Sequence, residues 1–293
     1  KNSSYLRLHE KEFVEEPFLQ QLEELGWNIV RLDTKQTPQD SDRESFSEVV
    51  LTPKLRDSLY QINPWLEEDQ IDEVVKTITT LPTNSLIENN QYILELLLQN
   101  TSVSENRKTK EKHPTVRYID FENSENNSFV AISQLKFRVL GTENHIYPDI
   151  TLFINGLPIA VIECKSPKAK EPISEAIDQL LRYSTQRGED KEGNKNLFYY
   201  NQILIATCRN QAKFGTITTH IEKHFFRWLD PYPKTVQELE HEGTAPNDQQ
   251  RLIQGMLCIE NLLSLIRTFT LFSVDPEGRT IKIVARYQQF RAV

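Results

Sequence analysis

The sequence has no apolar run near the ~18 residues that a membrane-spanning helix requires, and its first residues, KNSSYLRLHEKEF, lack the apolar core of a secretory signal. It does not begin with Met, so we expect a trimmed chain. Cysteine is scarce: Cys164, Cys208 and Cys258 are odd in number and form no CxxC, which argues against a disulfide framework or a zinc knuckle. We therefore expect a soluble cytoplasmic protein with no membrane partner.

An excess of basic residues is also missing. The net charge of -8 argues against a protein that coats nucleic acid by bulk attraction, although a few placed Lys and Arg could still form a local basic groove. No GxxxxGK[ST] is present, so the chain as given has no phosphate-binding loop for ATP. His220 and His224 occur as HIEKH without the HExxH order of a zinc protease, and we expect them on a solvated helix face.

Apolar spacing predicts a first helix over residues 10–25, which Gly26 would end. A helical insertion is expected at about 33–110, with short helices around Asp57, over 69–79 and over 90–98, separated by prolines. The pattern then becomes β-rich, and helical spacing returns from Ile173 to Leu181 before another apolar strand. The β-rich stretches are 115–121, 129–140, 149–154, 157–164 and the run from Gln202. This order predicts an α/β fold with a mixed central sheet flanked by helices.

The most informative stretch is YPDITLFINGLPIAVIECKSP, residues 147–167. It predicts a β-hairpin that turns at Asn155-Gly156, with both strands covered on both faces. Glu163 and Lys165 share one face of their strand, because strand side chains alternate. The register decides where Asp149 points. A regular hairpin with a two-residue turn pairs Asp149 with Ile162, whereas a three-residue loop or a bulge places it opposite Glu163.

The second register would permit metal chemistry. Asp149 and Glu163 would hold Mg²⁺ with the Cys164 carbonyl as a third ligand, and the metal would activate a water. Lys165 would orient that water and offset charge on the attacked phosphate. Gln179 and Tyr183 are four residues apart on one helical face, where they could contact the phosphate or brace Lys165. The alternative is an ion pair at a sheet edge, and the Cys164 side chain is expected to be a core residue.

These residues resemble the PD-(D/E)xK nuclease superfamily, through Pro148-Asp149, Glu163-Cys164-Lys165 and Gln179-x-x-x-Tyr183. The last element resembles the branch shared by RecB-like nucleases and type I restriction enzymes. Three further stretches are similar to the R (restriction and motor) subunit of type I restriction-modification enzymes. They are VEEPFLQQLEELGW from Val14, ATCRNQAKFGT from Ala206 and IKIVARYQQFRAV from Ile281.

The resemblance implies a nuclease domain over residues 1–230, a linker over 231–250, and the start of a helicase-like motor domain over 251–293 that stops before the ATP-binding loop. It implies Mg²⁺-dependent cleavage of double-stranded DNA (Mn²⁺ could substitute), in complex with methyltransferase (M) and specificity (S) subunits, with ATP used only by the full-length subunit. It assigns Glu15 to the site as an upstream acidic residue and Gln289 to adenine contact in the full-length protein. The alternatives are a non-catalytic docking and DNA-guiding module, or a stand-alone RecB-like nuclease.

Overall fold

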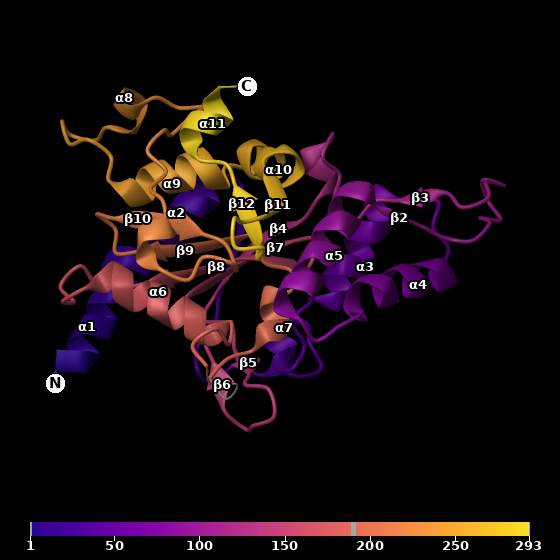
Figure 1. Ribbon diagram of the computed structural model, residues 1–293, viewed down its shortest axis with the longest axis horizontal. Coiled ribbons are helices and arrows are strands. Elements are labelled where there is room, and N and C mark those ends of the chain that lie inside the picture. Colours follow the sequence, from indigo (N-terminus) through magenta and orange to yellow (C-terminus); the bar gives the residue numbers. More distant parts are fainter. Residues whose placement is uncertain (1, 189–191, 293) are drawn as a thin grey trace.

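The centre of the molecule is a six-stranded mixed sheet with the order β1-β4-β7-β8-β9-β10 (Figure 1). The computed structural model describes residues 2–188 and 192–292, so residues 1 and 293, at the ends of the expected domains, lie outside it. The β1–β4 and β8–β9 pairs are parallel and the other pairs are antiparallel, which confirms the mixed sheet. Its strands are β1 (Asn28–Arg31), β4 (Phe129–Ser133), β7 (Ile150–Ile154), β8 (Leu157–Cys164), β9 (Ile203–Thr207) and β10 (Ala212–Gly215).

Three two-stranded ribbons lie outside this sheet. They pair β2 (Thr101–Ser102) with β3 (Thr115–Val116), β5 (Phe137–Arg138) with β6 (His145–Ile146), and β11 (Thr270–Val274) with β12 (Thr280–Val284).

Helices cover the sheet and form a separate lobe at one end. In the view of Figure 1, α9 and α10 lie on the other side of the strands from α6, while α3, α4 and α5 extend to the right. The α-helices are α1 (Asn2–Glu10), α2 (Glu16–Glu24), α3 (Thr52–Ile62), α4 (Glu68–Thr79), α5 (Leu86–Gln99), α6 (Pro172–Tyr183), α7 (Lys195–Phe198), α8 (Val236–Leu239), α9 (Asp248–Leu257), α10 (Ile259–Thr268) and α11 (Tyr287–Arg291). A π-helical segment, η1 (Lys11–Glu15), joins α1 to α2, and short 3₁₀ segments are η2 (Pro38–Ser41), η3 (Ser124–Asn126) and η4 (Glu222–His224).

One hydrophobic core joins these parts. It includes residues of α2, of the insertion helices α3, α4 and α5, of the sheet and of α9 and α10. The residues after the expected linker over 231–250 therefore pack with the residues before it. The Trp27 indole N–H donates to the Leu257 carbonyl over 3.0 Å, and the Gln249 amide donates to the Val14 carbonyl over 3.0 Å. Residues 248–268 are therefore held directly against the first helices. The division into nuclease domain, linker and motor domain stays a proposal.

The β7–β8 hairpin links the two ends of the molecule. Its turn packs closely on the helical lobe, because the Gly156 carbonyl accepts a hydrogen bond of 2.9 Å from the Leu51 N–H. A Cβ at Gly156 would lie 2.5 Å from the Leu51 carbonyl oxygen, so this approach requires glycine. The opposite end of the same hairpin carries Asp149 and Glu163.

Several expected elements differ from the structure. Strand β1 was not expected, and the expected strand over 115–121 is ordered as a strand only at Thr115–Val116. The expected strand over 129–140 divides into β4 and β5 because Gln134 adopts a positive φ of 56° and turns the chain. Apolar residues also predict one helix near 252–272. The structure divides it into α9 and α10 where Cys258 is extended (ψ 140°), and residues 270–272 belong to β11. The expected first helix, the helices of the insertion, and the helix that begins near Pro172 are confirmed.

Candidate active site

A β-bulge sets the register of the hairpin. Asn155 and Gly156 have φ values of 52° and 79°, which suits a two-residue turn with positive φ at both positions. Phe153 pairs with Pro158, but Leu152 pairs with Ala160, so Ile159 is the extra residue. Ile150 then pairs with Ile162, and the preceding Asp149 comes opposite Glu163. The structure therefore has the register in which Asp149 lies opposite Glu163. The turn has two residues, and the bulge produces this register.

The two carboxylates lie together in a buried site. Asp149 is 7% exposed and Glu163 is 1% exposed. The Asp149 carboxylate accepts hydrogen bonds from the Cys164 backbone N–H (2.7 Å) and the Gln134 amide (3.0 Å). Burial raises the pKa of Asp149, and burial followed by the charge of Asp149 raises the pKa of Glu163 well above its usual range. Such a pair favours a proton or a cation that neutralises it.

Lys165 supplies the positive charge nearest to this pair. Its ammonium donates to Glu163 Oε1 over 2.9 Å and to the Cys164 carbonyl over 3.1 Å. Burial alone would lower the pKa of Lys165, but the charges of Glu163 and Asp149 outweigh burial and raise it above its usual range. Lys165 is therefore a cation at neutral pH. It can donate hydrogen bonds and balance negative charge, but it is not a base.

Glu15 reaches the site from η1, and Gln134 connects it to Asp149. The single Gln134 Nε2 donates to Glu15 Oε2 and to Asp149 Oδ1, each over 3.0 Å. Burial and then the charge of Asp149 raise the pKa of Glu15 to about 8. Glu15 is the last residue of the π-helical turn Lys11–Glu15, and π turns inside α-helices are frequent at functional sites.

Two residues near the site were missed by the sequence analysis. One is Gln134. The other is Glu10, which accepts a hydrogen bond from the Ser166 N–H over 3.2 Å and whose pKa burial raises to about 7, even though Lys165 acts in the opposite direction. Glu10 was assigned only to the start of a helix. Glu10 lies five residues before Glu15, whereas neighbours on an α-helical face are three or four residues apart, so regular helical spacing gave no signal for it.

Gln179 and Tyr183 lie on α6, as expected, and contact each other. The Gln179 amide donates to the Tyr183 hydroxyl over 2.6 Å. Burial and then the negative charge of Glu163 raise the pKa of Tyr183, so its hydroxyl stays protonated beside the carboxylates. The structure gives neither residue a hydrogen bond to Lys165.

The residues present fit a hard cation such as Mg²⁺. Glu163 Oε2 is buried and has no hydrogen-bond partner, which leaves an acceptor for a metal or a proton. Within 2–188 and 192–292, no three His, Cys, Asp or Glu side chains form a metal cluster by themselves. A cation here would therefore also use the Cys164 carbonyl and waters, as Mg²⁺ commonly does.

Other candidate residues lie elsewhere. The expected helix carrying His220 and His224 is wrong: His220 precedes the short η4, both side chains are exposed, and the chain is extended at Ile221 (ψ 146°). Cys164 is fully buried in the core. The exposed Gln289 caps α11 by accepting from the Arg286 N–H over 2.8 Å.

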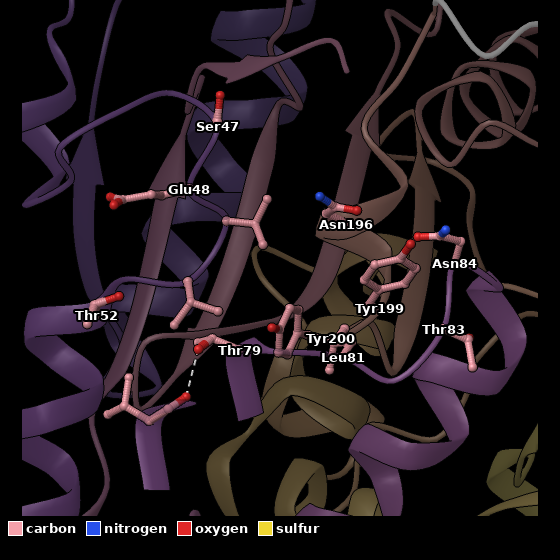
Figure 2. A pocket seen from close by; sticks show the side chains of 13 residues that line it. Ser47, Glu48, Thr52, Thr79, Leu81, Thr83, Asn84, Asn196, Tyr199 and Tyr200 are labelled. Carbon is pink, nitrogen blue, oxygen red and sulfur yellow. Dashed lines mark hydrogen bonds between the residues drawn. The ribbon is translucent and has the colours of Figure 1, made fainter. Parts of the chain in front are cut away.

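A cavity of about 590 Å³ lies between the helical lobe and α7, away from the carboxylates. Figure 2 shows Glu48, Asn84, Asn196 and Tyr199 around it. Glu48 is the one charged side chain in this lining, so the charge of the cavity does not favour a phosphate. The chemistry of the chain is concentrated at the hairpin end instead.

The fold and the site define an α/β protein with a buried carboxylate–lysine cluster at the open end of a β-hairpin. The family model described as type I restriction enzyme R protein N terminus (HSDR_N) matches residues 7–223, so the chain belongs to this family. It is the N-terminal region of a type I restriction enzyme R (endonuclease) subunit, as the motifs suggested.

Curated relatives support the same assignment. The type I restriction enzyme HindI endonuclease subunit of Haemophilus influenzae is 34% identical over 284 residues, which cover 96% of this chain and 26% of that protein. The putative MjaVIIIP endonuclease subunit of Methanocaldococcus jannaschii is 30% identical over 283 residues, 96% of this chain and 25% of that protein. The chain thus spans about a quarter of the length of these relatives. No helix among the described residues is long and apolar enough to cross a membrane.

Proposed function

We propose that this chain is a PD-(D/E)xK nuclease module that hydrolyses phosphodiester bonds of double-stranded DNA with one Mg²⁺. The observation that carries the proposal is the bulge at Ile159, which brings Asp149 opposite Glu163, together with the unpartnered, buried Glu163 Oε2. A structural ion pair alone needs one carboxylate for one lysine. Here two buried carboxylates face the ammonium of Lys165, so the pair still needs a cation or a proton to neutralise it.

Each residue has a distinct role. Asp149, Glu163 and the Cys164 carbonyl would hold the metal, which would supply Lewis-acid activation of water and stabilise charge on the phosphate. Lys165 is held by its two hydrogen bonds, so its remaining N–H can position the attacking water or the phosphate oxygen. Gln134 donates one hydrogen bond to Asp149 and one to Glu15, so Gln134 and Glu15 help to hold Asp149 in place. Gln179 and Tyr183 present an amide and a protonated hydroxyl that can donate to phosphate.

The biological setting follows from the relatives, which are named as endonuclease subunits of type I restriction enzymes. We infer that the module works within a longer R subunit that uses ATP, together with M and S subunits, to cut foreign DNA. Gln289 would contact adenine only in that longer protein.

Soaking crystals of the chain with Mn²⁺ tests the metal site directly. Anomalous density is expected between Asp149 and Glu163, and it should be absent from Glu163→Gln crystals under the same soak. Density elsewhere, or none at saturating Mn²⁺, would leave the carboxylates with a structural role and favour the docking and DNA-guiding alternative.

A further inference from the structure

A row of aromatic side chains lies beside the site, on α1 and on η1, which continues it. Tyr5, His9 and Phe13 are spaced by four residues, which places them on one face of the helix. The His9 and Phe13 rings are stacked, with centroids 4.5 Å apart and 27° between their planes. The Tyr5 and His9 centroids are 6.1 Å apart. We call these three residues the aromatic ladder.

The aromatic ladder is tied to the loop that follows Lys165. His9 Nδ1 and Ser166 Oγ form a hydrogen bond of 2.9 Å, and the Lys168 ammonium lies 4.9 Å from the centroid of the Tyr5 ring. Figure 1 shows α1 projecting beyond the sheet, next to the loop that leads into α6. Ser166, the hydrogen-bond partner of His9, directly follows Lys165, the lysine that the proposed function places at the phosphate.

Two rings of the aromatic ladder are exposed at the protein surface, where side chains are ordinarily polar. Phe13 is 44% exposed and Tyr5 is 50% exposed, and since His9 stacks on one side of Phe13, the exposure of Phe13 leaves its other side available. Four exposed basic residues lie on the same two segments: Arg7, Lys11, Lys168 and Lys170. Single-stranded nucleic acids bind exposed aromatic rings that have basic side chains nearby, through base stacking and phosphate contacts. In a paired duplex the base faces are already stacked on one another.

We propose that the aromatic ladder stacks on bases that are unpaired locally in one strand of the double-stranded DNA, so that the preferred substrate is a duplex with unpaired nucleotides next to the phosphate that is cut. This inference rests on the proposed nuclease function for its substrate, but it concerns binding and needs no metal. Phe13, at the end of the ladder, provides the main stacking surface. His9 supports it, and Lys168 contacts the backbone.

Binding in EDTA separates stacking from cleavage. The 293-residue chain is titrated into a fluorescent oligo-dT single strand and, separately, into a hairpin duplex of the same length. Phe13→Leu keeps an apolar side chain without a ring and should bind the single strand roughly tenfold more weakly, within the range known for one stacked base. Phe13→Trp should restore binding. Leu8→Ala is the control, because Leu8 is on the same helix and 57% exposed, and it should have no effect.

The outcomes are distinct. Duplex affinity should be the same in all four proteins, and a 2-aminopurine in the single strand should lose fluorescence with wild type and not with Phe13→Leu. Absence of single-strand binding by wild type, or equal affinity of Phe13→Leu and wild type, would overturn the inference. An effect of Phe13→Leu on self-association alone would also overturn the inference, because the ladder would then be an interface between copies of the chain. The proposed nuclease function would fail by a different result. Phe13-dependent binding together with no Mn²⁺ density at Asp149 and Glu163 would refute the nuclease proposal and leave the stacking inference standing.

Discussion

The Asp149 carboxylate accepts a 2.7 Å hydrogen bond from the backbone N–H of Cys164. This bond ties the start of β7 to the end of β8 and holds Asp149 beside Glu163 whether or not a metal is bound. A hydrogen bond to a charged carboxylate offsets part of the cost of its burial. Glu163 Oε2 has no such bond, so the cost of the second charge remains until a cation or a proton neutralises it.

Removing that charge should stabilise the metal-free protein. In Glu163→Gln the amide can donate to Asp149, and the repulsion between two buried carboxylates disappears. Burial and the charge of Asp149 raise the pKa of Glu163, so its ionisation opposes folding, and we expect Glu163→Gln to be more stable than wild type at pH 8. Mn²⁺ should raise the unfolding temperature of wild type and leave that of the variant unchanged. Calorimetry with and without Mn²⁺ measures both, and an equal response of the two proteins to Mn²⁺ would contradict the metal assignment.

Cleavage and ATP hydrolysis should separate in the assembled enzyme. Lys165→Ala or Glu163→Ala is expected to lower DNA cleavage by about a thousandfold, the scale for losing one preorganised transition-state contact. ATP hydrolysis should persist, because the proposed function assigns ATP to the longer R subunit and this chain contains no GxxxxGK[ST] motif. Lys112→Ala, which changes an exposed lysine between β2 and β3 of the helical lobe, should behave as wild type. Loss of ATPase in a well-folded Lys165→Ala enzyme would refute the separation.

Stability without metal should fall as the pH rises. Folding raises the pKa of Glu15 from 4.5 to about 8, so the folded protein binds the proton more tightly than the unfolded chain. This contribution is complete below pH 4.5 and is lost as the pH passes about 8. Thermal unfolding in EDTA from pH 5 to 9 should show the decline, and Glu15→Gln should flatten it. Glu12→Gln, at an exposed position on the same turn, should keep the wild-type slope.

The sequence predicted the elements of the site better than their register. Alternation placed Glu163 and Lys165 on one face, and Asn155-Gly156 marked the turn. Pro158 is a local sign of a bulge, because a proline cannot donate to the ladder and within sheets is found at edges, at first positions of strands and at bulges. The apolar residues around it do not say which residue bulges. The bulge depends on how Gly156 meets Leu51 and on how the strands fit the sheet, which are tertiary contacts.

Glu10 and Gln134 show a second limit. Gln134 lies in what reads as one strand from Phe129 to Leu140, and only its positive φ turns its side chain toward Asp149. Glu10 and Glu15 lie on one continuous helical segment, where the π turn changes which side chains share a face. Neither a positive φ at a non-glycine residue nor a π turn follows from helical or strand periodicity. Both features depend on packing around the site.

The turn of the hairpin should be sensitive to a single methyl group. In Gly156→Ala the new Cβ would meet the Leu51 carbonyl at 2.5 Å and the Leu55 N at 2.9 Å. We expect a loss of roughly 2–4 kcal/mol, from overpacking added to strain at positive φ. Gly278→Ala is the matched control, since Gly278 has nearly the same φ (80°) and no atom within 4 Å, and it should lose only ~1 kcal/mol. Denaturant unfolding of both variants measures the difference, and equal losses would show that the close approach is unimportant.

The last prediction concerns the hydroxyl of Tyr183. Its hydrogen-bond partner is the Gln179 amide at 2.6 Å, and its ring packs against the core, so Tyr183→Phe should keep the packing and change stability by less than ~0.5 kcal/mol. If the hydroxyl donates to phosphate, cleavage by the assembled Tyr183→Phe enzyme should fall roughly tenfold or more. Cleavage by Gln179→Ala should also fall.

Tyr118 provides the comparison, because its buried hydroxyl donates to the Val74 carbonyl over 2.9 Å in the helical lobe. Tyr118→Phe should lose ~1 kcal/mol of stability by leaving that carbonyl without its partner, and it should cleave DNA normally. Tyr183→Phe should therefore lose activity and keep stability, whereas Tyr118→Phe should lose stability and keep activity. Wild-type cleavage by both Tyr183→Phe and Gln179→Ala would mean that α6 only supports the sheet, because a group that contacts the phosphate in the transition state cannot be removed without slowing the reaction.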